Sequence, residues 1–333
     1  MKLLVTGGAG FIGSNFVRYI LKKYPSYRIV NLDKLTYAGN RGNISDLNAN
    51  PRHEFIRGDI ADRTTVDEAM AKVDAAVNFA AETHVDRSIA SATAFIKTNI
   101  SGTHTLLESA RKHRLSRFVH ISTDEVYGSI PRGSFTEKSG LNPSSPYSSS
   151  KAGADLIARS YFITHKVPVI ITRSSNNFGP FQYPEKVIPL FVINALEDKP
   201  LPLYGNGLNV RDWLYVLDNC EAIDKVLHKG KDGEIYNIGG STHLSNVELT
   251  KKILEMLGKS SKLIKKVDDR PAHDFRYAVN CTKIANDLGW RPRAIFDEAL
   301  AATITWYEIN KPWWKKIINN NYREYYRKQY GRA

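Results

Sequence analysis

The sequence predicts an α/β protein built on a doubly wound parallel sheet, followed by a smaller, loop-rich α/β domain. Short runs of aliphatic and β-branched residues alternate with helix-length amphipathic segments over the first half of the chain. A glycine-rich turn directly follows the first of these runs. After about residue 174 the alternation gives way to loops rich in Pro, Asn and Gly, with a few helices among them. The change of rhythm marks the expected boundary between the two domains.

Six apolar runs are the expected strands of the first domain. They are KLLVTG (2–7), RIVNLD (28–33), EFIRGD (54–59), DAAVNF (74–79), RFVHIST (117–123) and VPVIITR (167–173). Such runs are typical of parallel strands that helices cover on both faces. A further run, GEIYNIGG (233–240), predicts a strand that the second domain sends back to the first sheet. We therefore expect one domain over 1–174, with the strand near 233–240 added to it, and a second domain over 175–333.

Length and composition exclude several classes of protein. The 333 residues are 42% hydrophobic and 24% charged, which predicts an ordinary globular protein of about two domains. The two cysteines, Cys220 and Cys281, lie far apart and outside any metal-ligand spacing, so we expect neither a disulfide framework nor a metal site. No run of 18 apolar residues occurs, and glycine ends the short apolar start. We expect a cytoplasmic protein that does not bind membranes.

The net charge of +13 indicates an anionic partner, which could be nucleic acid, acidic lipid or a phosphorylated small molecule. Part of the charge lies in the C-terminal stretch KPWWKKIINNNYREYYRKQYGRA, where Lys and Arg residues are interspersed with aromatic residues. Such a pattern can bind single-stranded nucleic acid. The interpretation that we favour is a C-terminal helix that packs its Trp and Tyr side chains on the body and turns a basic face outward. Nucleic acid is therefore not an expected partner.

The turn after the first strand carries Gly7, Gly10 and Gly13 where a helix begins. Glycine there lets the backbone approach a pyrophosphate, and the helix N-terminus meets the negative charge. Asp33 ends the next strand, about twenty residues on, where a carboxylate can bind a ribose diol. This spacing predicts a Rossmann-type dinucleotide site. A carboxylate at Asp33 favours NAD over NADP, although Lys34 beside it is a minor signal for NADP.

A second motif supplies candidate redox chemistry. Tyr147 and Lys151 lie four residues apart in PYSSSKAGAD, so one turn of helix places both on the same face. We expect the ammonium group, and in addition the positive nicotinamide of an oxidised cofactor, to lower the pKa of the phenol and make it a usable base. Thr123 ends a strand about twenty residues earlier. The combination resembles the extended short-chain dehydrogenase/reductases, and this resemblance implies a catalytic set of Thr123, Tyr147 and Lys151.

Two acids, Asp124 and Glu125, follow Thr123 in the run STDEVYG. They could be a solvated turn, or they could be a pair of proton-transfer groups. A simple dehydrogenase has no use for them, whereas loss of water from a sugar needs one group to take a proton and another to give one. The run resembles the signature of the nucleotide-sugar 4,6-dehydratases. That resemblance makes Asp124 the acid that protonates the C6 hydroxyl and Glu125 the base that takes the C5 proton.

The resemblance extends over almost the whole chain, and it is strongest to the members of this family that act on dTDP-glucose. The stretches that carry it are VTGGAGFIGSNF, NLDKLTYAGN, GDIAD, NFAAETHVDRSI, STDEVYG, SPYSSSKAGAD, RSSNNFGPFQYPEKVIP, LYGNGLNVRDWLYV and DRPAHDFRYAVN. It implies tightly held NAD, dTDP-glucose as substrate in deoxysugar biosynthesis, and a homodimer formed through helices near 95–113 and 147–165. A dehydratase acting on a UDP-, CDP- or GDP-hexose, or a nucleotide-sugar epimerase, remains the alternative.

The family resemblance also assigns binding residues. For NAD, besides the three glycines, Tyr147 and Lys151, they are Phe11, Ile12, Asp33, Lys34, Leu35, Thr36, Asp59, Ile60, Phe79, Ala80, Ala81, Glu82, Thr83, Thr98 and Asn177. For the nucleotide sugar they are Thr83, Thr123, Asn176, Lys186, Val187, Pro202, Leu203, Tyr204, Arg211, Asn246, Asp269, Arg270, Pro271, Ala272 and His273.

The residues themselves support part of this second set. Arg211 and Arg270 carry guanidinium groups suited to a diphosphate, although each taken alone is more typical of a surface ion pair. His84 and His273 stand at no ligand spacing with another His or Cys, so packing or hydrogen bonding is expected of them. Ala272 stands where the family motif leads us to expect glycine.

Overall fold

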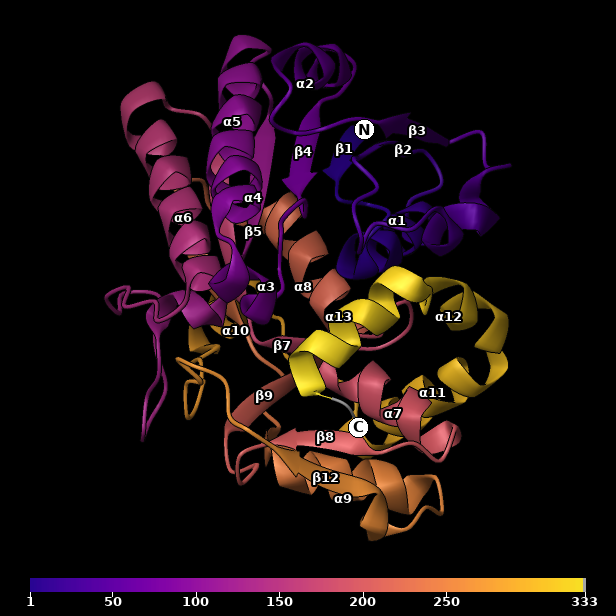
Figure 1. The fold of residues 1–333 in the computed structure, drawn as a ribbon. Helices are drawn as coiled ribbons and strands as arrows, with labels where there is room; N and C mark the ends of the chain where they lie inside the picture. Colours follow the sequence, from indigo (N-terminus) through magenta and orange to yellow (C-terminus); the bar gives the residue numbers. More distant parts are fainter. Residues whose placement is uncertain (332–333) are drawn as a thin grey trace.

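The computed structural model describes residues 1–331. A seven-stranded sheet forms the centre of the N-terminal part, in the order β10-β6-β5-β4-β1-β2-β3, and its paired strands are all parallel (Figure 1). Its strands are β1 (Lys2–Thr6), β2 (Arg28–Asp33), β3 (His53–Arg57), β4 (Ala75–Asn78), β5 (Arg117–Thr123), β6 (Val169–Ser174) and β10 (Ile235–Ile238). The six predicted strands and the returning seventh are confirmed.

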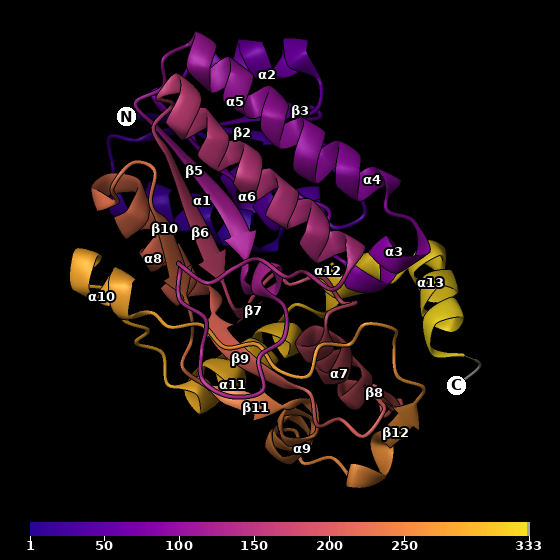
Figure 2. The same cartoon turned by 90° about the vertical axis from the view of Figure 1, so that its left-hand side faces the viewer.

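Helices cover both faces of this sheet (Figure 2). On one face α1 (Phe11–Lys23), α8 (Val216–Lys229) and α10 (Thr282–Leu288) share an apolar core with the sheet. On the other face α2 (Arg63–Met70), α5 (Thr103–Lys112) and α6 (Pro146–His165) do so. Leu4 faces the second core, while Leu3 and Val5 face the first, because successive side chains of a strand point to opposite faces.

The strand order reverses between β1 and β4. In open α/β sheets, ligands bind at such a switch point, outside the carboxyl ends of the strands. Short segments link the elements at this edge and around it. They are α3 (Val85–Ala90), α4 (Thr93–Phe95), a π-helical segment over Ile96–Gly102, and 3-10 turns at Arg41–Leu47, Asp124–Tyr127 and Ser261–Leu263.

The C-terminal part is smaller and contains mixed structure. A three-stranded sheet joins β7 (Asn176–Phe178), β9 (Val210–Tyr215) and β11 (His243–Ser245), while β8 (Leu201–Tyr204) pairs with β12 (Ile264–Val267). Its helices are α7 (Val187–Leu196), α9 (Asn246–Met256), α11 (Phe296–Ile309), α12 (Lys311–Ile317) and α13 (Asn320–Tyr330). Because α8, β10 and α10 belong to the first sheet, the chain crosses between the two parts several times. A division at residue 174 stays a prediction.

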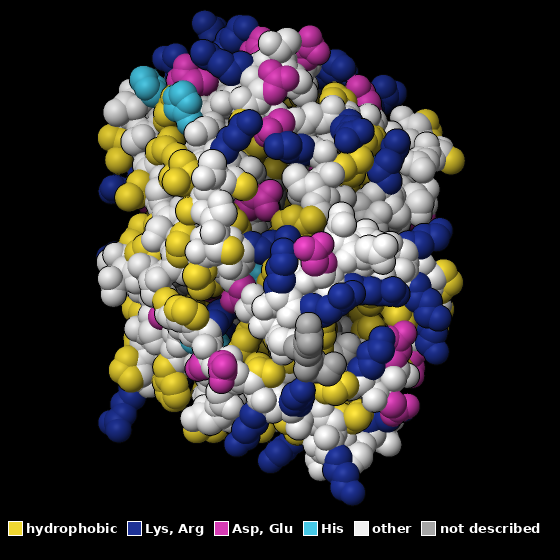
Figure 3. Space-filling view, viewed as in Figure 1, with side chains coloured by type: hydrophobic (Ala, Val, Ile, Leu, Met, Phe, Trp, Pro, Cys, Tyr) yellow, Lys and Arg dark blue, Asp and Glu magenta, His cyan; other side chains and the backbone are white. Residues whose placement is uncertain are grey.

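The C-terminal helices pack as the sequence indicates. Trp314 and Tyr322 are buried, whereas Lys315, Arg323 and Arg327 are exposed. Figure 3 shows Lys and Arg side chains scattered over this face of the molecule, with Asp and Glu between them. Among residues 1–331, no helix is long and apolar enough to cross a membrane, and no group of three or more His, Cys, Asp or Glu side chains could hold a metal ion.

Candidate active site

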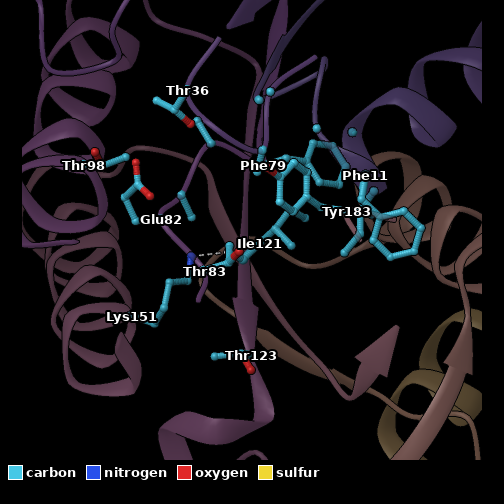
Figure 4. A pocket seen from close by; sticks show the side chains of 18 of the residues that line it. Phe11, Thr36, Phe79, Glu82, Thr83, Thr98, Ile121, Thr123, Lys151 and Tyr183 are labelled. Atoms are coloured by element: carbon cyan, nitrogen blue, oxygen red, sulfur yellow. Dashed lines mark hydrogen bonds between the residues drawn. The ribbon is translucent and has the colours of Figure 1, made fainter. Parts of the chain in front are cut away.

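A long cavity lies at the carboxyl ends of the central strands and extends toward the C-terminal part (Figure 4). It brings together the glycine turn, the strand-terminal acids and the Tyr147–Lys151 pair. Of the residues expected to bind NAD, all but Leu35 line it. Further lining residues that sequence reasoning missed include Ser122, Ser174, Ser175, Gln182, Tyr183 and Glu185. The serines could have been found, because they end or follow β5 and β6 at the same edge of the sheet.

The glycine turn leaves no room for side chains. Gly7 has φ +68, a conformation that glycine adopts at little cost. A Cβ on Gly7 would lie 2.6 Å from the backbone nitrogen of Ala80, and one on Gly13 would lie 2.4 Å from the carbonyl oxygen of Gly7. The bare backbone and the N-terminus of α1 therefore face the cavity together. This cradle fits the pyrophosphate of a dinucleotide.

The acidic end of β2 closes the turn. Asp33 is buried and accepts hydrogen bonds from the backbone N–H groups of Ala9 (2.9 Å) and Leu35 (2.8 Å). These bonds use part of its acceptor capacity and leave lone pairs for a ribose diol. The amide of Leu35, which has φ +58, therefore shapes the turn. Lys34 pairs with Asp59 at 2.7 Å, so its charge is already matched and gives little support to a 2'-phosphate.

The acid pair begins where β5 ends. Thr123 is the last residue of the strand and the N-cap of the 3-10 turn over Asp124–Tyr127. Its Oγ1 accepts a hydrogen bond from the backbone N–H of Glu125 (3.3 Å) and donates one to Asp124 Oδ1 (3.3 Å). A threonine cap is the local reason for the sharp change from strand to turn. The turn places all three side chains on the cavity.

Tyr147 and Lys151 come from the first turns of α6. A capping box of Ser145 and Ser148, with Pro146 at the start of the helix, fixes where α6 begins. Both Tyr147 and Lys151 are buried and line the cavity, as their spacing predicts. Lys151 Nζ donates a hydrogen bond to the carbonyl oxygen of Ile121 at 2.6 Å, drawn as a dashed line in Figure 4.

The expected depression of the tyrosine pKa by Lys151 and a positive nicotinamide stays a prediction, because for the protein by itself the pKa of Tyr147 is raised. Burial raises the pKa of Tyr147, and the negative charge of Glu125 raises it further, whereas a hydrogen bond with Thr123 lowers it. Burial also lowers the pKa of Lys151 to about 8, and Asp155 partly opposes this effect. The sequence pattern predicts that Tyr147 and Lys151 lie on one helix face, but it does not predict their burial, which is the largest influence on both pKa values. A phenolate at Tyr147 therefore needs positive charge beyond that of Lys151.

The two acids sit in unlike surroundings. Asp124 is 2% exposed, and burial raises its pKa well above the usual range, with the charges of Glu125 and Asp212 adding to the effect. Burial also raises the pKa of Glu125, but three cations, Arg270, Arg211 and Lys186, oppose that rise. Asp124 is thus the acid that holds its proton, and Glu125 the one closer to being a carboxylate.

Comparison with known proteins agrees with this geometry. Residues 4–303 match the family model described as GDP-mannose 4,6 dehydratase. The chain is 50% identical to a dTDP-glucose 4,6-dehydratase of Streptomyces niveus, covering 95% of this chain and 96% of that one. The crystal structure of DesIV, a dTDP-glucose 4,6-dehydratase from Streptomyces venezuelae with NAD and TYD bound, matches with a TM-score of 0.94 at 52% identity, over 95% of this chain and 100% of that one. The chain belongs to the dTDP-glucose 4,6-dehydratase family.

One relative with a different name is similarly close. The low-salt glycan biosynthesis protein Agl12 of Haloferax volcanii is 54% identical over 92% of this chain and 98% of its own length. The name of this relative connects it with glycan biosynthesis.

Three cations mark the part of this dehydratase-family site that lies beyond the acids. Arg270 Nη1 pairs with Asp86 at 3.3 Å, and its buried Nε has no hydrogen-bond partner within residues 1–331. Arg211 lies 4.5 Å over the ring of Tyr277, and Lys186 Nζ donates to the carbonyl oxygen of Thr83 (3.0 Å). All three cations lower the pKa of Glu125 and so favour its carboxylate form. Guanidinium and ammonium groups of this kind suit a diphosphate.

The remaining residues assigned to the nucleotide sugar are less uniformly placed. Asn176 and Thr83 line the cavity. Tyr204 donates to Asp86 Oδ2 (3.1 Å) and accepts from Gln329 of α13 (2.6 Å), so the C-terminal helix reaches this site, which the sequence did not indicate. His273 pairs with Asp269 at 2.6 Å. Most residues of this set lie outside the cavity lining: Val187 at the start of α7, Pro202, buried Leu203 and Tyr204 in β8, Arg211 in β9, Asn246 at the start of α9, and the segment of Asp269, Arg270, Pro271, Ala272 and His273.

Ala272 stands where the family motif leads us to expect glycine. Its φ is +51, in the left-handed region that favours glycine. Ala272 therefore adopts a backbone conformation that glycine, the residue expected from the motif, would adopt at lower cost.

Proposed function

We propose that this chain catalyses the dehydration of dTDP-glucose to dTDP-4-keto-6-deoxyglucose, with NAD as a cofactor that is regenerated in each cycle. The observation that carries the proposal is the juxtaposition of an acid pair, Asp124 and Glu125, with Thr123, Tyr147 and Lys151 at one end of the cavity. A simple dehydrogenase or an epimerase needs only the last three residues. The added acids are the feature that elimination of water requires.

The cofactor site fits NAD by its own geometry. The glycine cradle fits the pyrophosphate, Asp33 the adenosine ribose, and Asp59 and Ile60 border the space for the adenine. When bound, NAD accepts a hydride from C4 of the sugar and returns it to C6. The pairing of Lys34 with Asp59 supports NAD over NADP.

The first step is oxidation at C4. Tyr147, as a phenolate, takes the proton of the C4 hydroxyl, and Thr123 holds that oxygen. Burial and Glu125 raise the pKa of the phenol, so the phenolate would need the positive charge of Lys151 together with that of the oxidised nicotinamide. Its bond to Ile121 fixes the ammonium group against the end of β5.

The second step is elimination of water. The new ketone at C4 acidifies C5, and Glu125 removes the C5 proton. Asp124, which burial keeps protonated, gives its proton to the C6 hydroxyl, so the C6–O bond breaks and water leaves. Return of a proton to C5 completes the product. The cations around Glu125 support its role as base, because they favour its carboxylate form.

Substrate choice is expected to depend on three cations near Glu125, of which Lys186 lines the cavity while Arg211 and Arg270 lie outside its lining. Arg211, Arg270 and Lys186 provide for the diphosphate, and Tyr204 lies beyond them as a candidate contact for the base. The reaction would then supply a 4-keto-6-deoxy sugar nucleotide for deoxysugar synthesis of the dTDP-rhamnose type. We expect it to take place in the cytoplasm, without a nucleic-acid or membrane partner.

A homodimer is part of the proposal. Ile89, Ile96, Leu156 and Ile163 are large apolar side chains, between 39% and 56% exposed, on α3, on the π-helical segment and on α6. Helices near 95–113 and 147–165 would bury them against a second copy. Light scattering should therefore give about twice the chain mass, and Leu156→Glu should halve it.

Four substrates test the proposed activity. The purified protein is incubated with dTDP-, UDP- and CDP-glucose and with GDP-mannose, and the 4-keto product is detected by its absorbance in alkali. We expect the highest turnover with dTDP-glucose. Equal or higher turnover with another nucleotide would refute the assigned substrate, and absence of a 4-keto product with all four would refute the reaction.

A further inference from the structure

The proposed reaction moves a proton within the active site, and this inference rests on that proposed function. Tyr147 begins as a phenolate and ends as a phenol, because it takes the C4 hydroxyl proton. Asp124 begins as a neutral acid and ends as a carboxylate, because its proton leaves in water. Glu125 takes one proton from C5, and one proton returns to C5. One proton must therefore pass from Tyr147 to Asp124 before the next turnover.

The two side chains have little access to bulk water. Asp124 is 2% exposed and Tyr147 is 8% exposed. Lys151 cannot carry the proton as an ammonium group, since it has no acceptor, and it already donates to Ile121. A group inside the site is the simplest carrier.

Thr123, labelled in Figure 4, lines the same cavity as Asp124 and Tyr147. Its hydroxyl donates to Asp124 Oδ1 at 3.3 Å, and its side chain lies near enough to Tyr147 to lower the pKa of the phenol. The backbone N–H of Glu125 occupies one of its lone pairs at 3.3 Å and so fixes the rotamer. A hydroxyl has one donor and two acceptor positions, so the second lone pair is left for a proton from the phenol.

We propose that Thr123 returns the proton from Tyr147 to Asp124 at the end of each turnover. The O–H bond of Tyr147 breaks as Thr123 Oγ1 takes the proton. The original O–H bond of Thr123 breaks in turn, as Asp124 Oδ1 takes that hydrogen. A phenolate and a neutral carboxylic acid are formed again, and the protein gains or loses no proton.

The second oxygen of Asp124 completes the arrangement. Asp124 Oδ2 is buried and has no hydrogen-bond partner in the described part of the chain, so it is available to the C6 hydroxyl of the sugar. A half-turn of the carboxyl group exchanges the receiving and the donating oxygen, and this terminal torsion is soft. Protonation of Asp124 also removes one of the charges that oppose a phenolate at Tyr147. The transfer therefore helps to restore the base as well as the acid.

The test compares the first turnover with later ones. Rapid-quench measurements with excess dTDP-glucose are made on the NAD-loaded wild type, on Thr123→Val, which lacks the hydroxyl, and on Thr123→Ser, which keeps it. The first turnover starts from the correct protonation state, so Thr123→Val should form about one product per site. Its later turnovers should be about 10²- to 10⁴-fold slower than its own first one. Thr123→Ser should keep the wild-type ratio of the two rates.

The ratio separates this role from positioning of the C4 hydroxyl. If Thr123 only positions the substrate, Thr123→Val slows the first and later turnovers equally, and an unchanged ratio would overturn the proposal. A rapid spin filter then shows whether the first product has left the enzyme: free product supports slow proton return, whereas retained product overturns it in favour of slow release. Bound NAD content checks that the variant is folded. Failure of the wild type to form product at all would instead refute the proposed function.

Discussion

Exchange of each acid for its amide tests the division of labour between Asp124 and Glu125. Asp124→Asn removes a buried group that holds its proton, and Glu125→Gln removes a carboxylate that three cations favour. Both variants keep Thr123, Tyr147 and Lys151, so both should still oxidise C4. Loss of a positioned acid or base slows its step about 10²- to 10⁴-fold, or about 3 to 5 kcal/mol in the barrier.

A substrate with fluoride at C6 separates the two variants. Fluoride leaves with little help from an acid, so it should recover most of the loss in Asp124→Asn. It should not help Glu125→Gln, because the C5 proton must still be removed. Each variant is the control for the other, since both replace a carboxyl group by an amide on neighbouring residues.

Single-turnover absorbance of the reduced nicotinamide reports the oxidation, and uptake of deuterium at C5 from heavy water reports the second proton transfer. Equal rescue of both variants by fluoride would refute separate roles and make the two acids a coupled dyad.

Three further predictions concern the cofactor and the base. The protein should purify with NAD and turn over without added NAD; accumulation of NADH in step with product would contradict the closed cycle. Tyr147→Phe should form no transient NADH in a single turnover, and normal formation would move the base to another residue. Asp155→Asn should lower the pKa of Lys151 below about 8, so that the loss of activity at alkaline pH begins at a lower pH than in the wild type. The same variant should lose about 3 to 5 kcal/mol of unfolding free energy, because buried Arg173 loses its ion-pair partner at 2.9 Å. An unchanged alkaline limb in the pH–rate profile of Asp155→Asn would show that Lys151 does not depend on Asp155.

The sequence was sufficient for the features that local pattern controls. The apolar runs predicted the strands of the central sheet, and the glycine spacing predicted the turn between β1 and α1. The grouping of Thr123 with Tyr147 and Lys151 came instead from the resemblance of the motifs to a known family. In the structure all three residues line one cavity.

Features that depend on tertiary packing could not be predicted in this way. The return of α8 and α10 to the first sheet follows from their apolar faces meeting its core, which periodicity does not specify. The pKa of Tyr147 depends on burial more than on its neighbour four residues away. The contact between Gln329 and Tyr204 joins residues 125 positions apart, and no local signal marks it.

An isotope-crossover experiment tests the central claim most directly. dTDP-glucose that carries deuterium at C4 is mixed with dTDP-glucose that has ordinary hydrogen at C4 and a heavy carbon isotope elsewhere in the sugar. The products are analysed by mass spectrometry and NMR. If the hydride from C4 returns to C6 within one closed active site, deuterium appears at C6 only in molecules that began with it at C4. Deuterium at C6 of the other product molecules, or its loss to solvent, would contradict the proposed cycle.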